Sequence, residues 1–118
     1  MRMENRLVID ITEQNFDDEV LKSELPVFAC FVTSWCHSCY PACFIADELA
    51  RQYEGKIKFV KVDAEKNPKI SARYHVRSSP SIITFQGSQM VDMLPGYQEK
   101  ELLTGLLNAL ITGSSGVN

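Results

Sequence analysis

The chain has 118 residues, the size of one domain that can bury a core of its own. Hydrophobic residues make up 45% of it and charged residues 23%, which excludes a disordered or collagen-like chain. The net charge is −3 and no basic run is interleaved with aromatic residues, so we expect no nucleic-acid partner.

The N-terminal ten residues carry charges and lack the long apolar stretch and the small-residue cleavage site of a secretory signal. The longest nearly apolar run, residues 26–32, is too short to span a bilayer. The sequence therefore predicts a cytoplasmic protein without a membrane partner.

The first half of the chain predicts two strands, each followed by a helix. Residues 7–11 are an apolar run typical of a strand, and a short helix is predicted over about 13–23. Residues 26–32 are apolar without alternation, as in a strand buried on both faces of a parallel sheet. Residues 38–53 have a helical pattern that ends before Gly55. The apolar positions of this pattern are Phe44, Ile45, Leu49 and Tyr53.

The second half predicts a strand, a short helix, a hairpin and a final helix. The strand covers residues 56–63, and Asn67-Pro68 opens the short helix that carries Ile70 and Tyr74. Residues 81–85 and 90–94 are predicted to pair as an antiparallel hairpin. The last helix has an apolar stripe of five leucines, namely Leu102, Leu103, Leu106, Leu107 and Leu110.

This order of elements, β-α-β-α-β-α-β-β-α, predicts the α/β class, with a central mixed five-stranded sheet flanked by four helices on its two faces. We expect a single domain over residues 1–112 and a flexible C-terminal tail over residues 113–118, because the tail is short, polar and rich in Gly and Ser.

Four cysteines, Cys30, Cys36, Cys39 and Cys43, lie close together in the sequence. Cys36 and Cys39 stand between a predicted buried strand and the start of a predicted helix, where the helix dipole favours a thiolate. Such a pair predicts redox chemistry, in which the Cys36 thiolate attacks a substrate disulfide and Cys39 then attacks Cys36 to release the product. No bound cofactor is required, because the electrons reside on the sulfurs of the Cys36–Cys39 couple.

The same four sulfurs leave a second interpretation open, in which the cluster binds zinc or an iron–sulfur centre. Their spacing differs from the usual ferredoxin runs, and a free cysteine behaves as a small buried hydrophobe. We therefore expect Cys30 and Cys43 to fill the core and to hold no metal, with a regulatory or alternative disulfide as a further hypothesis.

The sequence also resembles the thioredoxin family, without gaps from Val27 to Gly96 and more loosely from Leu7 to Leu110. The resemblance rests on several motifs spread along the chain. They are Trp35-Cys36-x-x-Cys39, Lys61, Asn67-Pro68, the run Tyr74-x-Val76-Arg77-Ser78-Ser79-Pro80-Ser81, Phe85, and Gly96 before the last helix.

The resemblance implies the thioredoxin fold and an enzyme, a thiol–disulfide oxidoreductase that reduces or exchanges disulfides of protein substrates. It implies a cis peptide bond before Pro80, which would face the cysteine pair, and a Ser79 backbone that binds the substrate peptide. Trp35 and Gly96 would line the same surface. The partner implied for regeneration is a flavin-containing thioredoxin reductase that uses NADPH.

The turn between the two cysteines departs from the family pattern, because His37-Ser38 stands where most thioredoxins have Gly-Pro. A protonated histidine beside a thiolate stabilises it, and the loss of the proline loosens the turn, so we expect a less reducing couple. A role as disulfide isomerase or oxidant is therefore an alternative. Pro41, two residues beyond Cys39, predicts an irregular first helical turn.

The strand before the cysteine pair also departs from the pattern, because Cys30 replaces the buried aspartate that is thought to help deprotonate the resolving thiol. Lys61, the usual partner of that carboxylate, loses its counter-charge, so it should extend toward solvent or have a lowered pKa. We expect slower resolution of the mixed disulfide at neutral pH.

Overall fold

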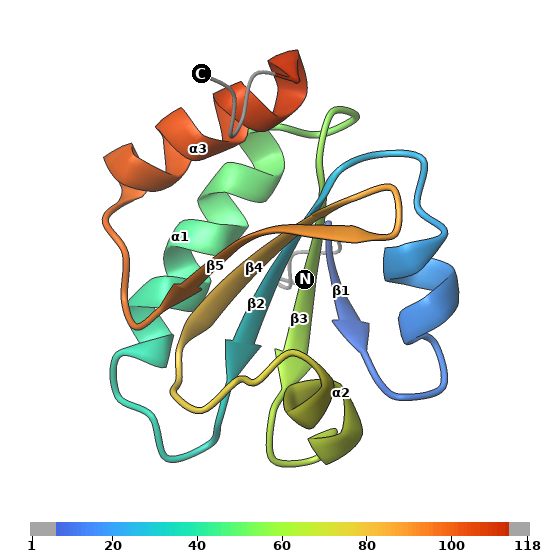
Figure 1. The fold of residues 1–118 in the computed structure, drawn as a ribbon. Coiled ribbons are helices and arrows are strands. Elements are labelled where there is room, and N and C mark those ends of the chain that lie inside the picture. Colours follow the sequence, from blue (N-terminus) through green and yellow to red (C-terminus); the bar gives the residue numbers. More distant parts are fainter. Residues whose placement is uncertain (1–6, 114–118) are drawn as a thin grey trace, which may run out of the picture.

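The structure is a computed structural model that describes residues 7–113, and these form one mixed five-stranded sheet in the order β1-β3-β2-β4-β5 (Figure 1). The predicted α/β class and the mixed sheet with four helices are confirmed. The strands are β1 (Val8–Ile11), β2 (Val27–Val32), β3 (Lys58–Asp63), β4 (Ser81–Gln86) and β5 (Gln89–Pro95). The helices are the one-turn π-helix η1 (Asp17–Leu21), α1 (Cys39–Gln52), α2 (Pro68–Arg73) and α3 (Lys100–Thr112).

The strand directions bring four chain segments to one edge of the sheet. β1, β3 and β2 are parallel, so the loops that follow them leave from the same edge. β4 is antiparallel to β2, with Phe31 opposite Ser81, so β4 begins at that edge. β5 is antiparallel to β4, with Ser81 opposite Pro95, so β5 ends there. Residues far apart in the sequence therefore meet at the carboxyl end of β2.

Helices cover both faces of the sheet (Figure 1): α1 and α3 lie on one face, and η1 and α2 lie on the other. Each face has its own buried cluster, and alternate residues of the central strands point into one or the other. On the α1/α3 face, Phe28 stacks against Phe59 with ring centroids 4.8 Å apart. On the opposite face, Phe16 and Tyr74 pack against Phe85.

The two long helices follow the predicted periodicity, with a difference at the border of each stripe. Leu49 of α1 and Tyr53, which directly follows α1, are buried as predicted, but Phe44 is 66% exposed. In α3, Leu103, Leu107 and Leu110 are buried, but Leu102 is 50% exposed. Small residues of α1, Ala46 and Ala50, complete its buried face because they allow close approach to the sheet.

The helix predicted over residues 13–23 is wrong in extent, because only the single turn η1 forms. A turn capped by side chains leads into η1: the Thr12 N–H donates to Asn15 Oδ1 at 2.7 Å, the Gln14 N–H donates to Thr12 Oγ1 at 3.2 Å, and the Phe16 N–H donates to the Thr12 carbonyl at 3.0 Å. These are the hydrogen bonds of a capped helix start, although the regular helix covers only η1.

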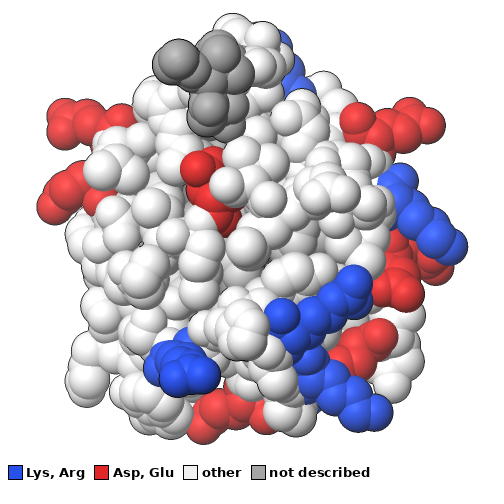
Figure 2. All heavy atoms as spheres, viewed as in Figure 1, with Lys and Arg blue, Asp and Glu red and all other residues white. Residues whose placement is uncertain are grey.

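The end of α3 is closed by Gly113, whose φ of 76° is the left-handed conformation typical of a residue that ends a helix. Most of the predicted tail, residues 114–118, lies outside the described residues. Within residues 7–113, none of the helices combines the length and the apolar character needed to cross a bilayer. On the face of the described chain in Figure 2, acidic and basic side chains are interspersed around the rim, without a continuous basic band.

Candidate active site

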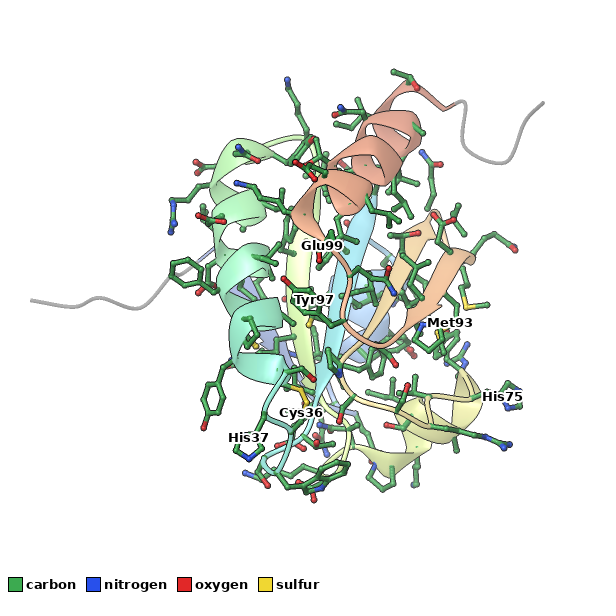
Figure 3. All side chains as sticks on the ribbon, turned by 90° about the vertical axis from the view of Figure 1, so that its left-hand side faces the viewer. Cys36, His37, His75, Met93, Tyr97 and Glu99 are labelled. Atoms are coloured by element: carbon green, nitrogen blue, oxygen red, sulfur yellow. A yellow bond between two sulfur atoms is a disulfide. The ribbon has the colours of Figure 1, made fainter. Side chains whose placement is uncertain are left out.

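A disulfide joins Cys36 and Cys39 at the amino end of α1, with the two Cα atoms 5.4 Å apart. β2 ends at Val32, and the short loop that follows turns into the helix through hydrogen bonds from the Cys39 N–H to the Cys36 carbonyl and from the Tyr40 N–H to the His37 carbonyl. Figure 3 shows Cys36 at this end of the helix. Both sulfurs therefore lie where the helix dipole stabilises negative charge.

The disulfide is largely covered but opens into a small pocket. Cys36 and Cys39 are each 6% exposed. Both line a pocket of about 180 Å³, to which the end of β2 and the first turns of α1 contribute. The other lining residues are Val32, Thr33, Ser34, Tyr40 and Cys43. One side of the disulfide can thus be approached from this pocket.

The segment around Pro80 meets the cysteine loop at the same edge of the sheet. The Ser79–Pro80 peptide bond is cis, and Pro80 is buried. The Ser79 hydroxyl is hydrogen-bonded to the Thr33 hydroxyl at 2.8 Å, and Thr33 lines the pocket of the disulfide. The Gly96 N–H donates to the Pro80 carbonyl at 2.7 Å, so the end of β5 is held against the start of β4.

Trp35 lies on the outside of the loop and is 67% exposed. Its indole N–H donates to Glu65 Oε2 at 2.8 Å, and the Ser34 hydroxyl donates to Glu65 Oε1 at 3.0 Å. Glu65 was missed by the sequence analysis. The available signal is topological, because Glu65 follows β3 and β3 runs parallel beside β2.

The two residues between the cysteines have different surroundings. The Ser38 hydroxyl lies 3.8 Å from the Cys36 sulfur, within hydrogen-bonding distance of it. His37 is exposed, and Figure 3 shows it on the outer side of the loop. Pro41 is the third residue of α1, where a backbone N–H is not yet needed within the helix, so α1 runs unbroken from Cys39. The irregularity predicted from Pro41 is confined to the i→i+3 hydrogen bonds of the turn at the start of α1.

Cys30 lies on β2 beneath α1 and is 1% exposed, as predicted for a core cysteine. Its pKa is raised well above the ordinary value, first because its thiol is hydrogen-bonded to Cys43 and second because it is buried. Cys30 therefore remains a protonated thiol near neutral pH. The raised pKa supports the expectation that Cys30 is a poorer proton acceptor than a carboxylate at this position.

Lys61 lies on β3 directly opposite Cys30 in the strand register and is half-buried. It lines a second, larger hollow of about 570 Å³ at the carboxyl ends of the parallel strands, together with Asp10 and Asp63. Its positive charge lowers the pKa of both free cysteines, although this effect on Cys30 is smaller than the opposing effects of Cys43 and burial.

Cys43 differs from the prediction that it fills the core, because it is half-buried and lines the pocket of the disulfide. Its pKa is lowered to about 7, chiefly by the hydrogen bond with Cys30, while burial acts in the opposite direction. Cys43 is thus the more acidic of the two thiols. The sequence placed Cys43 one helical turn after Cys39, but the pairing with Cys30 depends on how α1 packs on β2.

Within residues 7–113, no group of three or more His, Cys, Asp or Glu side chains is arranged to hold a metal ion. His75, the second histidine, is exposed and lies on the opposite side of the molecule from Cys36 in Figure 3.

Comparisons with known proteins point the same way as the geometry. The family model described as Thioredoxin matches residues 7–109. Thioredoxin 1 from Nostoc sp. is 42% identical over 97 residues, which are 82% of this chain and 91% of that protein. Thioredoxin from Synechocystis sp. is 39% identical with the same coverage of each chain. Thioredoxin from Pyropia yezoensis is 36% identical over 105 residues, 89% of this chain and 98% of the relative.

Proposed function

The chain belongs to the thioredoxin family of thiol–disulfide oxidoreductases, and on that premise we propose that Cys36 is its nucleophile and Cys39 its resolving thiol. The observation that carries the proposal is the Cys36–Cys39 disulfide at the amino end of α1, open to a pocket on one side. The matches to thioredoxins favour this role over an isomerase, an oxidant or a metal carrier.

In the proposed reaction the chain starts as the dithiol, and the Cys36 thiolate attacks one sulfur of a substrate disulfide. The other substrate sulfur leaves as a thiolate, and a mixed disulfide remains on Cys36. Cys39 then loses its proton and attacks the Cys36 sulfur, which releases the second substrate thiolate. Two electrons have passed to the substrate, and the chain is left with the Cys36–Cys39 disulfide of this structure.

The substrate-binding surface of the proposal consists of Trp35, Ser79, Pro80 and Gly96. Two hydrogen bonds hold this surface together. Ser79 is hydrogen-bonded to Thr33, which lines the pocket, and the Gly96 N–H donates to the Pro80 carbonyl. In the proposal, an extended peptide pairs with the backbone of Ser79, while the exposed indole of Trp35 offers apolar contact area.

The redox-tuning residues of the proposal are His37, Ser38, Cys30 and Lys61. Ser38 acts through its hydroxyl close to the Cys36 sulfur, and His37 through its position in the same turn. Cys30 and Lys61 act from the sheet beneath α1, where they are opposite one another.

Members of the thioredoxin family act through a redox-active disulfide without a cofactor, on substrates that contain disulfides. We extend this to a thioredoxin reductase that uses NADPH as the regenerating partner. A cytoplasmic location belongs to the same proposal, because the dithiol has to be restored after each turnover. Consumption of NADPH by a thioredoxin reductase in the presence of the oxidised chain tests the partner.

A matched pair of variants tests the roles of the two cysteines. With insulin as substrate, we expect Cys36→Ser to abolish disulfide reduction and to form no adduct. We expect Cys39→Ser to accumulate a mixed disulfide with the substrate, detected by mass spectrometry and reversed by dithiothreitol. An adduct on Cys39 in the Cys36→Ser variant, at the rate of the wild type, would contradict the assignment.

A further inference from the structure

Beneath the redox disulfide lies a second pair of sulfurs, Cys30 and Cys43, which the proposed reaction does not use. Cys30 is closed off in the core, whereas Cys43 is half-buried and reaches the pocket that the disulfide lines. The two thiols interact between β2 and α1, and this interaction raises the pKa of Cys30 and lowers that of Cys43. The core thiol is thus linked through Cys43 to the site of disulfide exchange.

Cys43 is also close to the resolving thiol along α1. It follows Cys39 by four residues, and side chains at this spacing lie one above the other on a helix face. Both side chains line the same pocket of about 180 Å³. That volume exceeds the space of a single water molecule, about 30 Å³, through which a general base can act.

We propose that the Cys43 thiolate is the general base that removes the proton of Cys39 when the mixed disulfide is resolved. This rests on the proposed roles of Cys36 and Cys39. The proton passes from the Cys39 thiol to Cys43 and then to solvent through the pocket, and the Cys39 thiolate attacks Cys36. No electrons pass to Cys43, which changes only between thiolate and thiol and keeps its oxidation state.

The charges around Cys43 suit this role near neutral pH. Its pKa is lowered to about 7, first by the hydrogen bond that Cys30 donates, whereas burial raises it. Lys61 on β3 lowers it further, and Asp47 on α1 raises it. Cys36 bears no charge in the mixed disulfide, as in the disulfide of this structure, so it does not oppose a thiolate at Cys43.

The arrangement replaces the carboxylate that the family has at the position of Cys30. Cys30 has too high a pKa to accept a proton, but its thiol hydrogen bond supports a thiolate on its neighbour. The proton acceptor is thereby moved from the strand to the helix, closer along the chain to Cys39.

Rapid acid quench during oxidation of the reduced chain by glutathione disulfide separates the two steps. Mass spectrometry then counts the dithiol, the Cys36 adduct and the Cys36–Cys39 disulfide over time. In Cys43→Ser, which keeps the size of the side chain but not its acidity, we expect the adduct to persist about tenfold to a hundredfold longer near neutral pH. The rate of Cys36 attack should be unchanged.

The pH profile distinguishes a general base from a packing residue. In the wild type the resolving rate should rise through a pH of about 7, where Cys43 ionises, and then level off. In Cys30→Ala this inflection should move to higher pH, because the donor to Cys43 is lost. Phe44→Ala, next to Cys43 but exposed, is the matched control and should keep the wild-type profile.

Three results would overturn the proposal. The first is that the Cys36 adduct is equally short-lived in Cys43→Ser and in the wild type at every pH of the profile. The second is that Cys43 is found in a disulfide during turnover. The third is that the rate at which iodoacetamide alkylates Cys43 in the oxidised wild type shows no inflection near pH 7. Failure of the proposed function would differ, because Cys36 would then form no adduct at any pH.

Discussion

Three hydrogen bonds to one carboxylate hold the loop before the redox cysteines. Glu65 accepts from the Ser34 N–H at 3.4 Å, from the Ser34 hydroxyl at 3.0 Å and from the Trp35 indole at 2.8 Å. Because most of the Trp35 ring is exposed, packing alone does not fix its orientation. A single residue from the loop after β3 therefore determines how the indole is presented beside the disulfide.

We expect Glu65→Ala to release Trp35 and to raise KM for a protein disulfide by about threefold to tenfold, since each hydrogen bond to a charged group contributes about 1.5–3 kcal/mol before solvent screening. Trp35 is the only tryptophan of the chain, so its fluorescence anisotropy reports the change directly. Glu65→Gln, whose amide oxygen still accepts, is the control and should stay close to the wild type. Unchanged anisotropy in Glu65→Ala would show that the carboxylate does not orient the ring.

At the scale of elements, α3 is held to the sheet by a leucine stripe that also packs against α1. Leu107 is fully buried at the centre of the stripe, whereas Leu102 lies at its border and is half exposed. Tyr53 of α1 adds a polar link, because its hydroxyl donates to Asn108 Oδ1 at 2.7 Å. The position of α3 therefore depends on a few side chains that can be tested one at a time.

Leu107→Ala should lower the free energy of unfolding by about 2–5 kcal/mol, because the truncated side chain leaves a cavity in a packed core. Leu102→Ala deletes the same atoms at an exposed position and should cost less than about 1 kcal/mol. Urea unfolding of both variants with an unchanged m-value measures the difference. Equal losses for the two leucines would mean that α3 is held by contacts other than this stripe.

Apolar runs and periodicity in the sequence were sufficient to predict every strand and the three α-helices. Central strands such as β2 are buried on both faces, whereas the long helices bury one face of regular spacing. It was insufficient at the borders of the helix stripes, where Phe44 and Leu102 carry apolar side chains but face solvent. A period of 3.6 residues fixes which residues share a face, but the width of the buried face depends on the sheet beneath it. The helix predicted over 13–23 is also longer than η1, because periodicity does not fix the residues at which a helix begins and ends.

The residues of the candidate site likewise fall into those that the sequence identified and those that it missed. The cysteine pair and Pro80 belong to short motifs, so the sequence alone identified them. Glu65 and the role of Cys43 were missed, because each depends on which segments the folded sheet and helix bring together. Side chains that act through a partner distant in sequence leave no local pattern to read.

At the scale of the whole molecule, the redox site is assembled at one sheet edge from the ends of β2, β3 and β5 and the start of β4. The core on both faces of the sheet holds these ends in place, while the helix dipole of α1 acts on Cys36. The reduction potential is therefore a property of the complete fold, because it measures the difference in free energy between the folded dithiol and the folded disulfide.

We expect the couple to be less reducing than the roughly −270 mV typical of thioredoxins, a reference value that does not come from this structure. The Ser38 hydroxyl lies near the Cys36 sulfur, and the turn lacks the stiffening proline of the family, so the dithiol form is favoured. Replacing both residues together, His37→Gly with Ser38→Pro, should lower the potential by tens of millivolts, where about 30 mV corresponds to a tenfold change in the equilibrium constant. Equilibration with glutathione buffers, read out by Trp35 fluorescence, measures both proteins. A wild-type potential at or below the reference would mean that His37 and Ser38 leave the balance between dithiol and disulfide to the rest of the fold.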